Sequence, residues 1–248
     1  VASSSVLSGA GVLVTLTARD AAGNIVTSGS PTIAFGRTGG TSTGSFSAET
    51  NNNDGTYTAT FTGAVAGTAT TITGTINGVS VTSTLPTVQV LPGALSLAQS
   101  FVSVSSPTVT SGNTVTLTFT ARDASGNNIT TGGQSVLFSR TGGTSAGNIS
   151  STTDNANGTY TATFTATTSG SATSISATVG GSSVTSTLPT ITVSPGAISL
   201  SQSLISVSAG STQSGSNLTV TLTTRDAAGN FITTGSATVL FGHSGGTS

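Results

Sequence analysis

The residues of this chain that could do chemistry are few, and they recur. Arg-Asp pairs stand at positions 19/20, 122/123 and 225/226, a spacing of 103 residues both times. Such a pair could be an ion pair in a binding cleft, but neighbouring residues on a strand point to opposite faces and cannot readily pair with each other. After each Asp come first two small residues, then a Gly, then an Asn. This order is typical of a tight turn in which the Asp carboxylate accepts hydrogen bonds from backbone amides. Asp123 is therefore most simply a turn residue.

The other ionisable residues do not form a recognisable catalytic set. The six acids lie at turns, one to three per repeat, whereas acid-base catalysis needs groups that are paired around a reacting centre. His243 is the only His, and it aligns with Arg37 and Arg140 in the loop pattern F-x-R-T-G-G-T-S. A residue that is interchangeable with Arg is a poor candidate for catalysis or for metal binding. We predict no catalytic residue and no enzymatic activity.

Two loop patterns look superficially like ligand sites. Residues 154–158, Asp-Asn-Ala-Asn-Gly, and residues 51–55 in the first copy suggest calcium, but the bidentate Glu of an EF-hand loop is absent. The loops at 37–42 and 140–145 look faintly like phosphate loops, yet no Gly-Lys-Ser/Thr follows them. They are most simply flexible loops at one pole of each repeat. We therefore expect no metal site and no cofactor-binding site.

The elements that carry these motifs are strands. Val115, Leu117 and Phe119 alternate with Thr, and this period of two predicts a half-buried strand with a Thr-rich outer face. Tyr57 and Tyr160 follow a Gly turn by two residues and have inward parity. We expect both rings in the core, with each hydroxyl bonded to nearby backbone.

Seven short strands and no helix are expected in the middle repeat. Gly180-Gly181 predicts a two-residue hairpin between the last two strands. The apolar parity changes within the first strand, which predicts that it divides its pairing between two sheets, and again around Pro189, where a bulge or a sheet-switching bend would explain it. The fold class is all-β, a β-sandwich. The expected strands are 95–104, 114–121, 135–139, 147–153, 159–164, 172–179 and 183–193.

The spacing of 103 residues divides the chain into repeats without any insertion or deletion. Pro-Gly-Ala recurs at 92–94 and 195–197, where we place the junctions, since Pro cannot continue a ladder. Residues 1–92 are then a repeat that lacks its first strand, 93–195 a complete repeat, and 196–248 the N-terminal half of a third. We expect a window onto a longer repeat protein. The short junctions predict an extended array with a limited range of inter-repeat angles.

Composition excludes several partners. Charged residues make up 4% of the chain, and the net charge is −1. Binding to nucleic acid needs clustered Lys or Arg, so no nucleic acid partner is expected. There is no basic run for an anionic membrane surface and no apolar run of the roughly 20 residues that a spanning helix needs. We expect no membrane contact through these domains.

The order of signatures resembles that of a known family. TxTxRDxxGNxIT, then DNANGTYTATF, a hairpin and a closing TLPTITV strand resemble the bacterial immunoglobulin-like domains of invasin- and intimin-type adhesins, and are similar to filamin repeats. The resemblance covers the complete repeat. It implies tandem seven-stranded immunoglobulin-like sandwiches that act as stalk modules of a large surface adhesin or extracellular fibre protein, at the cell surface or outside the cell.

Two functions from different classes follow. The first is a structural stalk or filament, and the alternative is a ligand- or glycan-binding module with recognition in its loops. Outward strand positions are rich in Thr and Ser and almost free of charge, so little repulsion opposes close packing of neighbouring arrays. The expected partners are other copies of the chain, joined laterally or head to tail, with a surface glycan as a further possibility.

Overall fold

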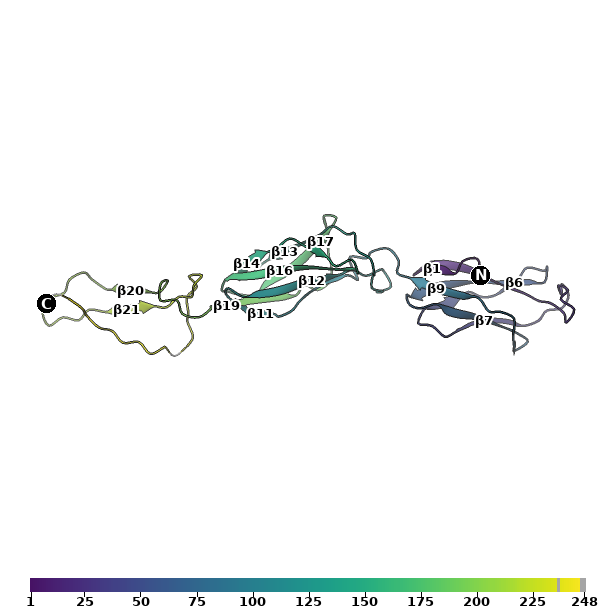
Figure 1. Cartoon of the computed structure of the whole chain (residues 1–248), viewed down its shortest axis with the longest axis horizontal. Helices are drawn as coiled ribbons and strands as arrows, with labels where there is room; N and C mark the ends of the chain where they lie inside the picture. Colours follow the sequence, from purple (N-terminus) through teal and green to yellow (C-terminus); the bar gives the residue numbers. More distant parts are fainter. Residues whose placement is uncertain (236, 246–248) are drawn as a thin grey trace.

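The three repeats lie end to end along one line (Figure 1). The computed structural model describes residues 1–235 and 237–245, and within these ranges every regular element is a strand. The predicted third repeat, 196–248, includes residues 236 and 246–248, which lie outside the described residues. The all-β fold class expected from the alternating pattern is confirmed.

Residues 1–92, 93–195 and 196–248 are called repeats 1, 2 and 3, and repeat 2 is a sandwich of two sheets. One sheet has the order β10-β12-β16-β14, with β15 beside β16, and the other has the order β11-β19-β17-β13, with β18 beside β17. Nine of the ten segments fall on the seven predicted strands, two of which are broken in two, and β11 lies beyond the predicted end of the first strand at residue 104. Their bounds are β10 (Phe101–Val104), β11 (Thr108–Thr110), β12 (Thr114–Thr120), β13 (Val136–Thr141), β14 (Ala146–Ile149), β15 (Thr153–Asp154), β16 (Thr159–Thr168), β17 (Thr173–Val179), β18 (Ser182–Ser183) and β19 (Thr190–Ser194).

Two predictions made from changes of apolar parity, one for the first strand and one for the last, are corrected by the structure. The chain does divide its pairing between the two sheets, but not within the predicted strand 95–104: β10 pairs antiparallel with β12 in one sheet, while β11, which lies beyond residue 104, runs parallel to β19 in the other. The first strand is shorter than expected, since residues 96–100 lie outside the ladder. The last strand does not switch sheets at Pro189: β18 and β19 both pair with β17, and the chain only leaves the ladder between them.

Repeat 1 has the same two sheets without a counterpart of β10. Repeat 3 contributes one antiparallel pair, β20 with β21. The sheets of repeat 1 have the orders β2-β6-β4, with β5 beside β6, and β1-β9-β7-β3, with β8 beside β7. The bounds are β1 (Ser5–Leu7), β2 (Gly11–Thr17), β3 (Ile33–Thr38), β4 (Thr43–Phe46), β5 (Thr50–Asn51), β6 (Thr56–Val65), β7 (Thr70–Ile76), β8 (Val79–Ser80), β9 (Thr87–Leu91), β20 (Leu204–Val207) and β21 (Val220–Thr223).

The core lies between the two sheets of each repeat. Along β12 the residues alternate between buried and accessible, as the period of two predicts. In repeat 2 Leu117 and Phe119 pack with Tyr160 and Phe164 in a single cluster that spans the sandwich. The rings of Phe119 and Tyr160 are tilted, with their centroids 5.9 Å apart. The inward placement of Tyr160 and Tyr57 is confirmed.

The Arg-Thr-Gly-Gly-Thr-Ser loops are anchored, which corrects the expectation of flexible loops. Ser42 and Ser145, their last residues, are fully buried. The Ser145 hydroxyl accepts a hydrogen bond from the Val193 amide at 2.9 Å, and Ser42 accepts one from the Val90 amide at the same distance. Each loop is thus tied to the last strand of its own repeat, because a buried amide needs a partner.

The two tyrosines give a matched test of this packing. Tyr160 Oη accepts a hydrogen bond from the Gln134 amide at 3.0 Å, whereas Pro31 holds the counterpart position in repeat 1 and has no N–H to donate. Tyr160→Phe should therefore destabilise repeat 2 by about 1 kcal/mol, and Tyr57→Phe should leave repeat 1 nearly unchanged. Amide exchange followed by mass spectrometry on the full chain measures each repeat separately. Equal effects of the two substitutions would contradict this account.

Candidate functional site: the junction between repeats

Most residues that the sequence singles out are dispersed. His243 is exposed at the far end of repeat 3. Asp154 closes its own loop, since its carboxylate accepts the amides of Ala156 and Gly133 at 2.8 and 2.7 Å. Within residues 1–235 and 237–245, no three His, Cys, Asp or Glu side chains gather in a group that could hold a metal ion. The same ranges contain no helix long and apolar enough to cross a membrane.

Asp123 closes the turn that the sequence predicts. Its Oδ1 accepts the amides of Ser125 and Asn127, both at 2.9 Å, and the Gly126 amide bonds to the Asp123 carbonyl at 3.0 Å. Gly126 has a φ of +83°, a conformation that glycine adopts without steric cost. The turn assignment is confirmed, yet Asp123 is only 1% exposed, which a surface turn does not require.

The second oxygen of Asp123 explains this burial. Asp123 Oδ2 accepts the amide of Gly93, in the Pro-Gly-Ala segment that joins repeats 1 and 2, at 2.8 Å. It also accepts Asn127 Nδ2 at 2.9 Å. A buried carboxylate is tolerated when its lone pairs are satisfied by hydrogen bonds. One side chain therefore fixes both the turn and the chain that enters the repeat.

Asn127 carries the contact across to the preceding repeat. Its Nδ2 donates to the Ala64 carbonyl at 2.9 Å and to Ser8 Oγ at 3.0 Å, while its Oδ1 accepts the Ala66 amide at 2.9 Å. The amide thus uses its donor and its acceptor together on repeat 1. We call the pair of Asp123 and Asn127, with these partners, the junction latch.

The second junction repeats the latch at the same offset of 103 residues. Asp226 Oδ2 accepts the Gly196 amide at 2.9 Å and Asn230 Nδ2 at 2.8 Å. Asn230 Nδ2 donates to the Thr167 carbonyl at 2.8 Å and to Ser111 Oγ at 3.1 Å, and its Oδ1 accepts the Ser169 amide at 2.9 Å. Every partner of the first latch therefore has its counterpart in the second.

The first copy of the motif forms the same turn without a repeat against it. Asp20 Oδ1 accepts the amides of Ala22 and Asn24 at 3.0 and 2.8 Å, and Asn24 Nδ2 donates to Asp20 Oδ2 at 3.1 Å. Both side chains are exposed. The bonds between the Asp and the Asn of the turn therefore form without a neighbouring repeat. The remaining bonds of the latch, from the Asn side chain, form only where another repeat is in contact.

The latch stabilises the ionised carboxylate. Burial of Asp226 opposes ionisation and by itself raises its pKa, but the donors Asn230 Nδ2 and Gly196 N, with the amides of Asn230 and Ala228, outweigh burial and lower the pKa from 3.8 to about 2. The pKa of Asp123 is lowered in the same way. Burial raises it, but the hydrogen bond from the linker amide of Gly93 and those from Asn127 lower it by more.

The Arg of each Arg-Asp pair turns away from the latch. The Arg122 guanidinium lies 4.7 Å from the centre of the Phe101 ring, and Arg122 Nε donates to Asn128 Oδ1 at 3.0 Å. In repeat 3 the guanidinium of Arg225 lies 4.3 Å from the centre of the Phe231 ring. The inference that adjacent Arg and Asp do not pair is consistent with this geometry, and Arg instead covers an aromatic face.

Reading the motif as a turn alone missed the role of Asn127. The available signal was the joint repetition of Asp, Asn and the linker Gly at one offset, because three positions that recur together point to a shared contact. A groove lies beside each junction, of about 350 Å³ at the first and about 700 Å³ at the second. Asn127 lines the first and Asn230 the second, together with residues of the preceding repeat.

Removing the latch amide should loosen the junction. Asn127→Ala deletes three contacts with repeat 1, each worth about 1 kcal/mol, so the distribution of distances between labels on Ala34→Cys and Leu137→Cys should broaden. The chain has no native Cys, which keeps the labelling specific. Asn24→Ala is the matched control, because it alters the same turn in repeat 1 and touches neither the junction at Gly93 nor the one at Gly196. A distribution that stays narrow in Asn127→Ala would show that the latch does not set the geometry.

Acid should open the latch. The folded pKa of Asp226, about 2, lies below its ordinary value of 3.8, so its contribution to stability is present above about pH 4 and is lost as the pH falls through about 2. Labels on Leu137→Cys and Thr221→Cys should report a narrow distance distribution at pH 5 and a broad one near pH 2. Asp226→Asn should remove this dependence on pH. A wild-type distribution that is unchanged at pH 2 would argue against the carboxylate as the closing group.

The comparisons with known proteins agree with the fold. The profile of the family described as "Invasin, domain 3" matches residues 8–93 and 96–196. The solved structure of FdeC, an Escherichia coli adhesin, is 30% identical with a TM-score of 0.52, and the match covers 90% of this chain and 71% of that one. Comparison with curated protein sequences gives no match.

Two further structures are similar at lower TM-scores. InvD of Yersinia pseudotuberculosis is 26% identical, covering 93% of this chain and 68% of that one at a TM-score of 0.49. Invasin, a bacterial integrin-binding protein, is 24% identical, covering 78% and 38% at a TM-score of 0.46. The resemblance stated from the motif order is confirmed by the family match: the chain belongs to the invasin domain 3 family, the immunoglobulin-like repeats of bacterial invasin-type surface adhesins.

Proposed function

We propose that this chain is a structural stretch of a bacterial surface adhesin, a stalk that spaces other parts of the protein and carries no catalytic site. The observation that carries the proposal is that the two junctions contain the same latch. Gly93, Asp123 and Asn127 make the bonds that Gly196, Asp226 and Asn230 make one repeat later. Identical bonds fix identical relative placements, so each repeat extends the array by the same step.

The linker leaves little freedom to change the placement of one repeat relative to the next. Only Pro-Gly-Ala separates the last strand of one repeat from the opening segment of the next, and the Gly amide in the linker is itself bound by the latch. A Cβ on Gly93 would lie 3.1 Å from the Ser8 carbonyl oxygen, so the linker passes close to the preceding repeat. An end-to-end line of repeats (Figure 1) is the shape that these constraints favour.

The relatives support a position at the cell surface. The matched family is that of invasin domain 3, and FdeC is described as an Escherichia coli adhesin. For this chain we propose a location that is extracellular or at the cell surface, without assigning it an adhesion target. Assembly with other copies of itself is part of the proposal, since surfaces with 4% charged residues offer little electrostatic repulsion.

A glycan-binding role is the second candidate, and one observation favours it. Phe231 is 56% exposed and lines the groove at the second junction, where an exposed ring beside polar groups could stack on a sugar. The site is not repeated, because Asn128 and Ile25 hold the counterpart positions. The exposure of Phe231 was not predicted from the sequence, where only the inward tyrosines were weighed as rings that could bind a sugar.

Scattering and glycan binding distinguish the two functions. A stalk should scatter in solution as a rod that extends by roughly 35 to 45 Å per repeat, given strands of about ten residues at ~3.3 Å each plus loops, and should bind no glycan on an array. A collapsed cluster of repeats would contradict the stalk. Robust glycan binding that is lost in Phe231→Ala and kept in Phe241→Ala, which alters another exposed ring, would favour the second candidate.

A further inference from the structure

The opening and closing strands of one sheet are direct neighbours and run in the same direction. In repeat 2, β11 lies parallel to β19. At one end of this ladder the Thr192 amide donates to the Pro107 carbonyl, and at the other the Ser111 amide donates to the Ser194 carbonyl, both at 2.9 Å. Repeat 1 pairs β1 with β9 in the same register, at the offset of 103 residues. One ladder thus joins an early and the last segment of each sandwich.

Tension along the array would load this ladder in shear. The linker to repeat 3 follows Ser194 at the end of β19, so a pull from repeat 3 draws β19 toward one pole. A pull from repeat 1 draws the start of β11 toward the other pole. The strands of repeat 2 lie close to the long axis of the array (Figure 1). Because the bonds cross from strand to strand, sliding stretches them together instead of one after another.

A pull from repeat 1 meets β10 before it reaches β11. The chain enters at Gly93, Leu95 forms a bridge with Asp123, and β10 then pairs antiparallel with β12. The ladder of β10 with β12 also lies along the direction of the pull (Figure 1). Both ladders are therefore loaded along their strands, and a pull through the linkers peels neither of them from one end.

The other edge of β19 is bonded through a buried serine. The Val193 amide donates to Ser145 Oγ at 2.9 Å, and Ser145 Oγ donates to the Gly170 carbonyl at 3.0 Å. The Gly170 amide donates to the Val193 carbonyl at 3.0 Å. The hydroxyl of Ser145 thus connects two backbone groups of neighbouring segments and ties the loop 140–145 to the last strand. Ser145 is 0% exposed, so water does not compete for these bonds.

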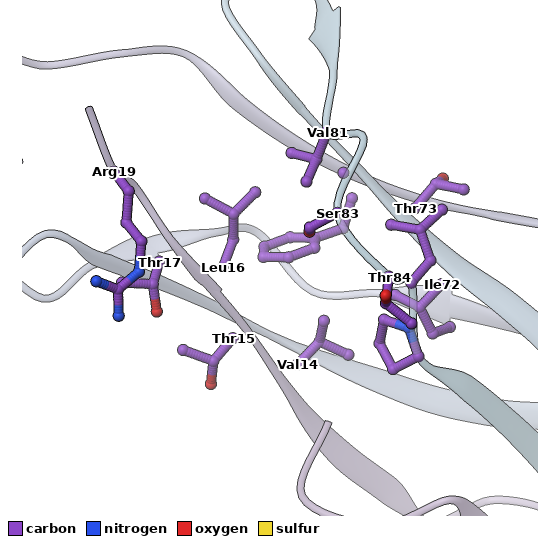
Figure 2. A pocket seen from close by; sticks show the side chains of 14 residues that line it. Val14, Thr15, Leu16, Thr17, Arg19, Ile72, Thr73, Val81, Ser83 and Thr84 are labelled. Atoms are coloured by element: carbon purple, nitrogen blue, oxygen red, sulfur yellow. The ribbon is translucent and has the colours of Figure 1, made fainter. Parts of the chain in front are cut away.

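The beginning of the last strand is held at the same point in both repeats. The Ile175 amide donates to the Pro189 carbonyl in repeat 2, and the Ile72 amide donates to the Pro86 carbonyl in repeat 1, both at 2.8 Å. Figure 2, a close view of the groove between β2 and residues 81–86, shows Thr84 next to Ile72 on this side of repeat 1. The last strand is therefore bonded at its beginning as well as at its end.

The recurrence of these bonds is what tension requires. In a row of repeats every member carries the same force, so the weakest member sets the limit of the row. In repeat 1 Ser42 Oγ accepts the Val90 amide at 2.9 Å, and the Gly67 amide donates to the Val90 carbonyl at 3.0 Å. The Ser8 amide donates to the Leu91 carbonyl at 2.8 Å at the end of the ladder. Both repeats thus hold their last strand by equivalent contacts.

We propose that each sandwich is a load-bearing unit, in which the ladder of β11 with β19, or of β1 with β9, sets the force at which the repeat opens. We call this ladder, together with the buried serine that binds the last strand, the clamp. The inference rests on the stalk of the proposed function and adds resistance to tension to it. A stalk that only spaces needs fixed junctions, whereas one that transmits a pull also needs sandwiches that do not open from their ends.

The direction of pulling tests the clamp while every clamp residue is kept. The chain has no native Cys, so handles attach to introduced ones, and optical tweezers measure the opening rate of repeat 2 at constant force. Handles on Ala94→Cys and Ala197→Cys, equivalent positions in the two linkers, load the clamp along its strands. Handles on Asn113→Cys and Ala197→Cys lie at one pole and peel β11 from β19. Opening along the strands should be slower by roughly tenfold or more at the same force. Equal rates would overturn the proposal.

A substitution at Ser145 tests the serine of the clamp. Ser145→Ala leaves the Val193 amide without its partner and should raise the opening rate along the strands roughly tenfold. Tyr160→Phe is the matched control, because it also removes a hydroxyl that accepts one backbone amide, but that hydroxyl bonds to neither β11 nor β19. It should change the rate under load by less than about twofold, although both variants should be less stable to denaturant.

Equal effects of Ser145→Ala and Tyr160→Phe under load would show that the serine stabilises the repeat without bearing the pull, and its part in the clamp would be wrong. If Ser145→Ala does not fold, the comparison of pulling directions decides. Asn127→Ala loosens the junction and leaves every clamp bond in place, so it should not change the opening rate of repeat 2. A rate that rises as much as in Ser145→Ala would assign the resistance to the latch and overturn the clamp.

The outcomes separate the clamp from the stalk. Rod-shaped scattering together with equal opening rates in the two pulling directions would keep the stalk and overturn the clamp. A collapsed cluster of repeats together with slow opening along the strands would keep the clamp and overturn the stalk.

Discussion

The arrangement of the repeats depends on a buried carboxylate that serves two segments at once. One oxygen of Asp123 holds the turn of its own repeat, and the other holds the linker amide of Gly93 and the side chain of Asn127. Burial of a carboxylate is costly unless hydrogen bonds satisfy it, so turn and linker stabilise it together. Because Asn127 then bonds to repeat 1, the path of the linker and the placement of the neighbouring repeat are set by the same few atoms.

The low charge of the chain makes this choice of interaction necessary. With 4% charged residues and no Lys, repeats have almost no ion pairs with which to orient one another. Neutral amide bonds are directional and short, and salt screens them far less than it screens exposed charges. The contact between Asn230 and Thr167 fixes orientation without a charge on either partner. Arg225, the neighbour of Asp226 in the sequence, lies against Phe231 and leaves the carboxylate to neutral donors.

The sequence predicts the fold of each repeat more completely than it predicts the contacts between repeats. Alternation of the kind seen at Val115, Leu117 and Phe119 depends on local geometry, and it predicted the strands and the inward Tyr160. The division of the opening strand between two sheets was expected within residues 95–104, but it occurs beyond them. The loop ending at Ser145 was misjudged because its anchor, the Val193 amide, lies 48 residues away. The latch was missed for the same reason: a turn is encoded within a few residues, whereas the contacts of Asn127 with repeat 1 require knowing which poles meet.

Repeats 1 and 2 together show what the opening strand contributes. Val14 pairs with Ala59 as Leu117 pairs with Ala162, so the ladder between the second and fifth strands has the same register whether or not the opening strand is present. The junction beyond repeat 1 is equally intact. What differs is the core, which is one cluster with the strand and two without it. The opening strand therefore closes the core of a sandwich whose topology the other strands already define.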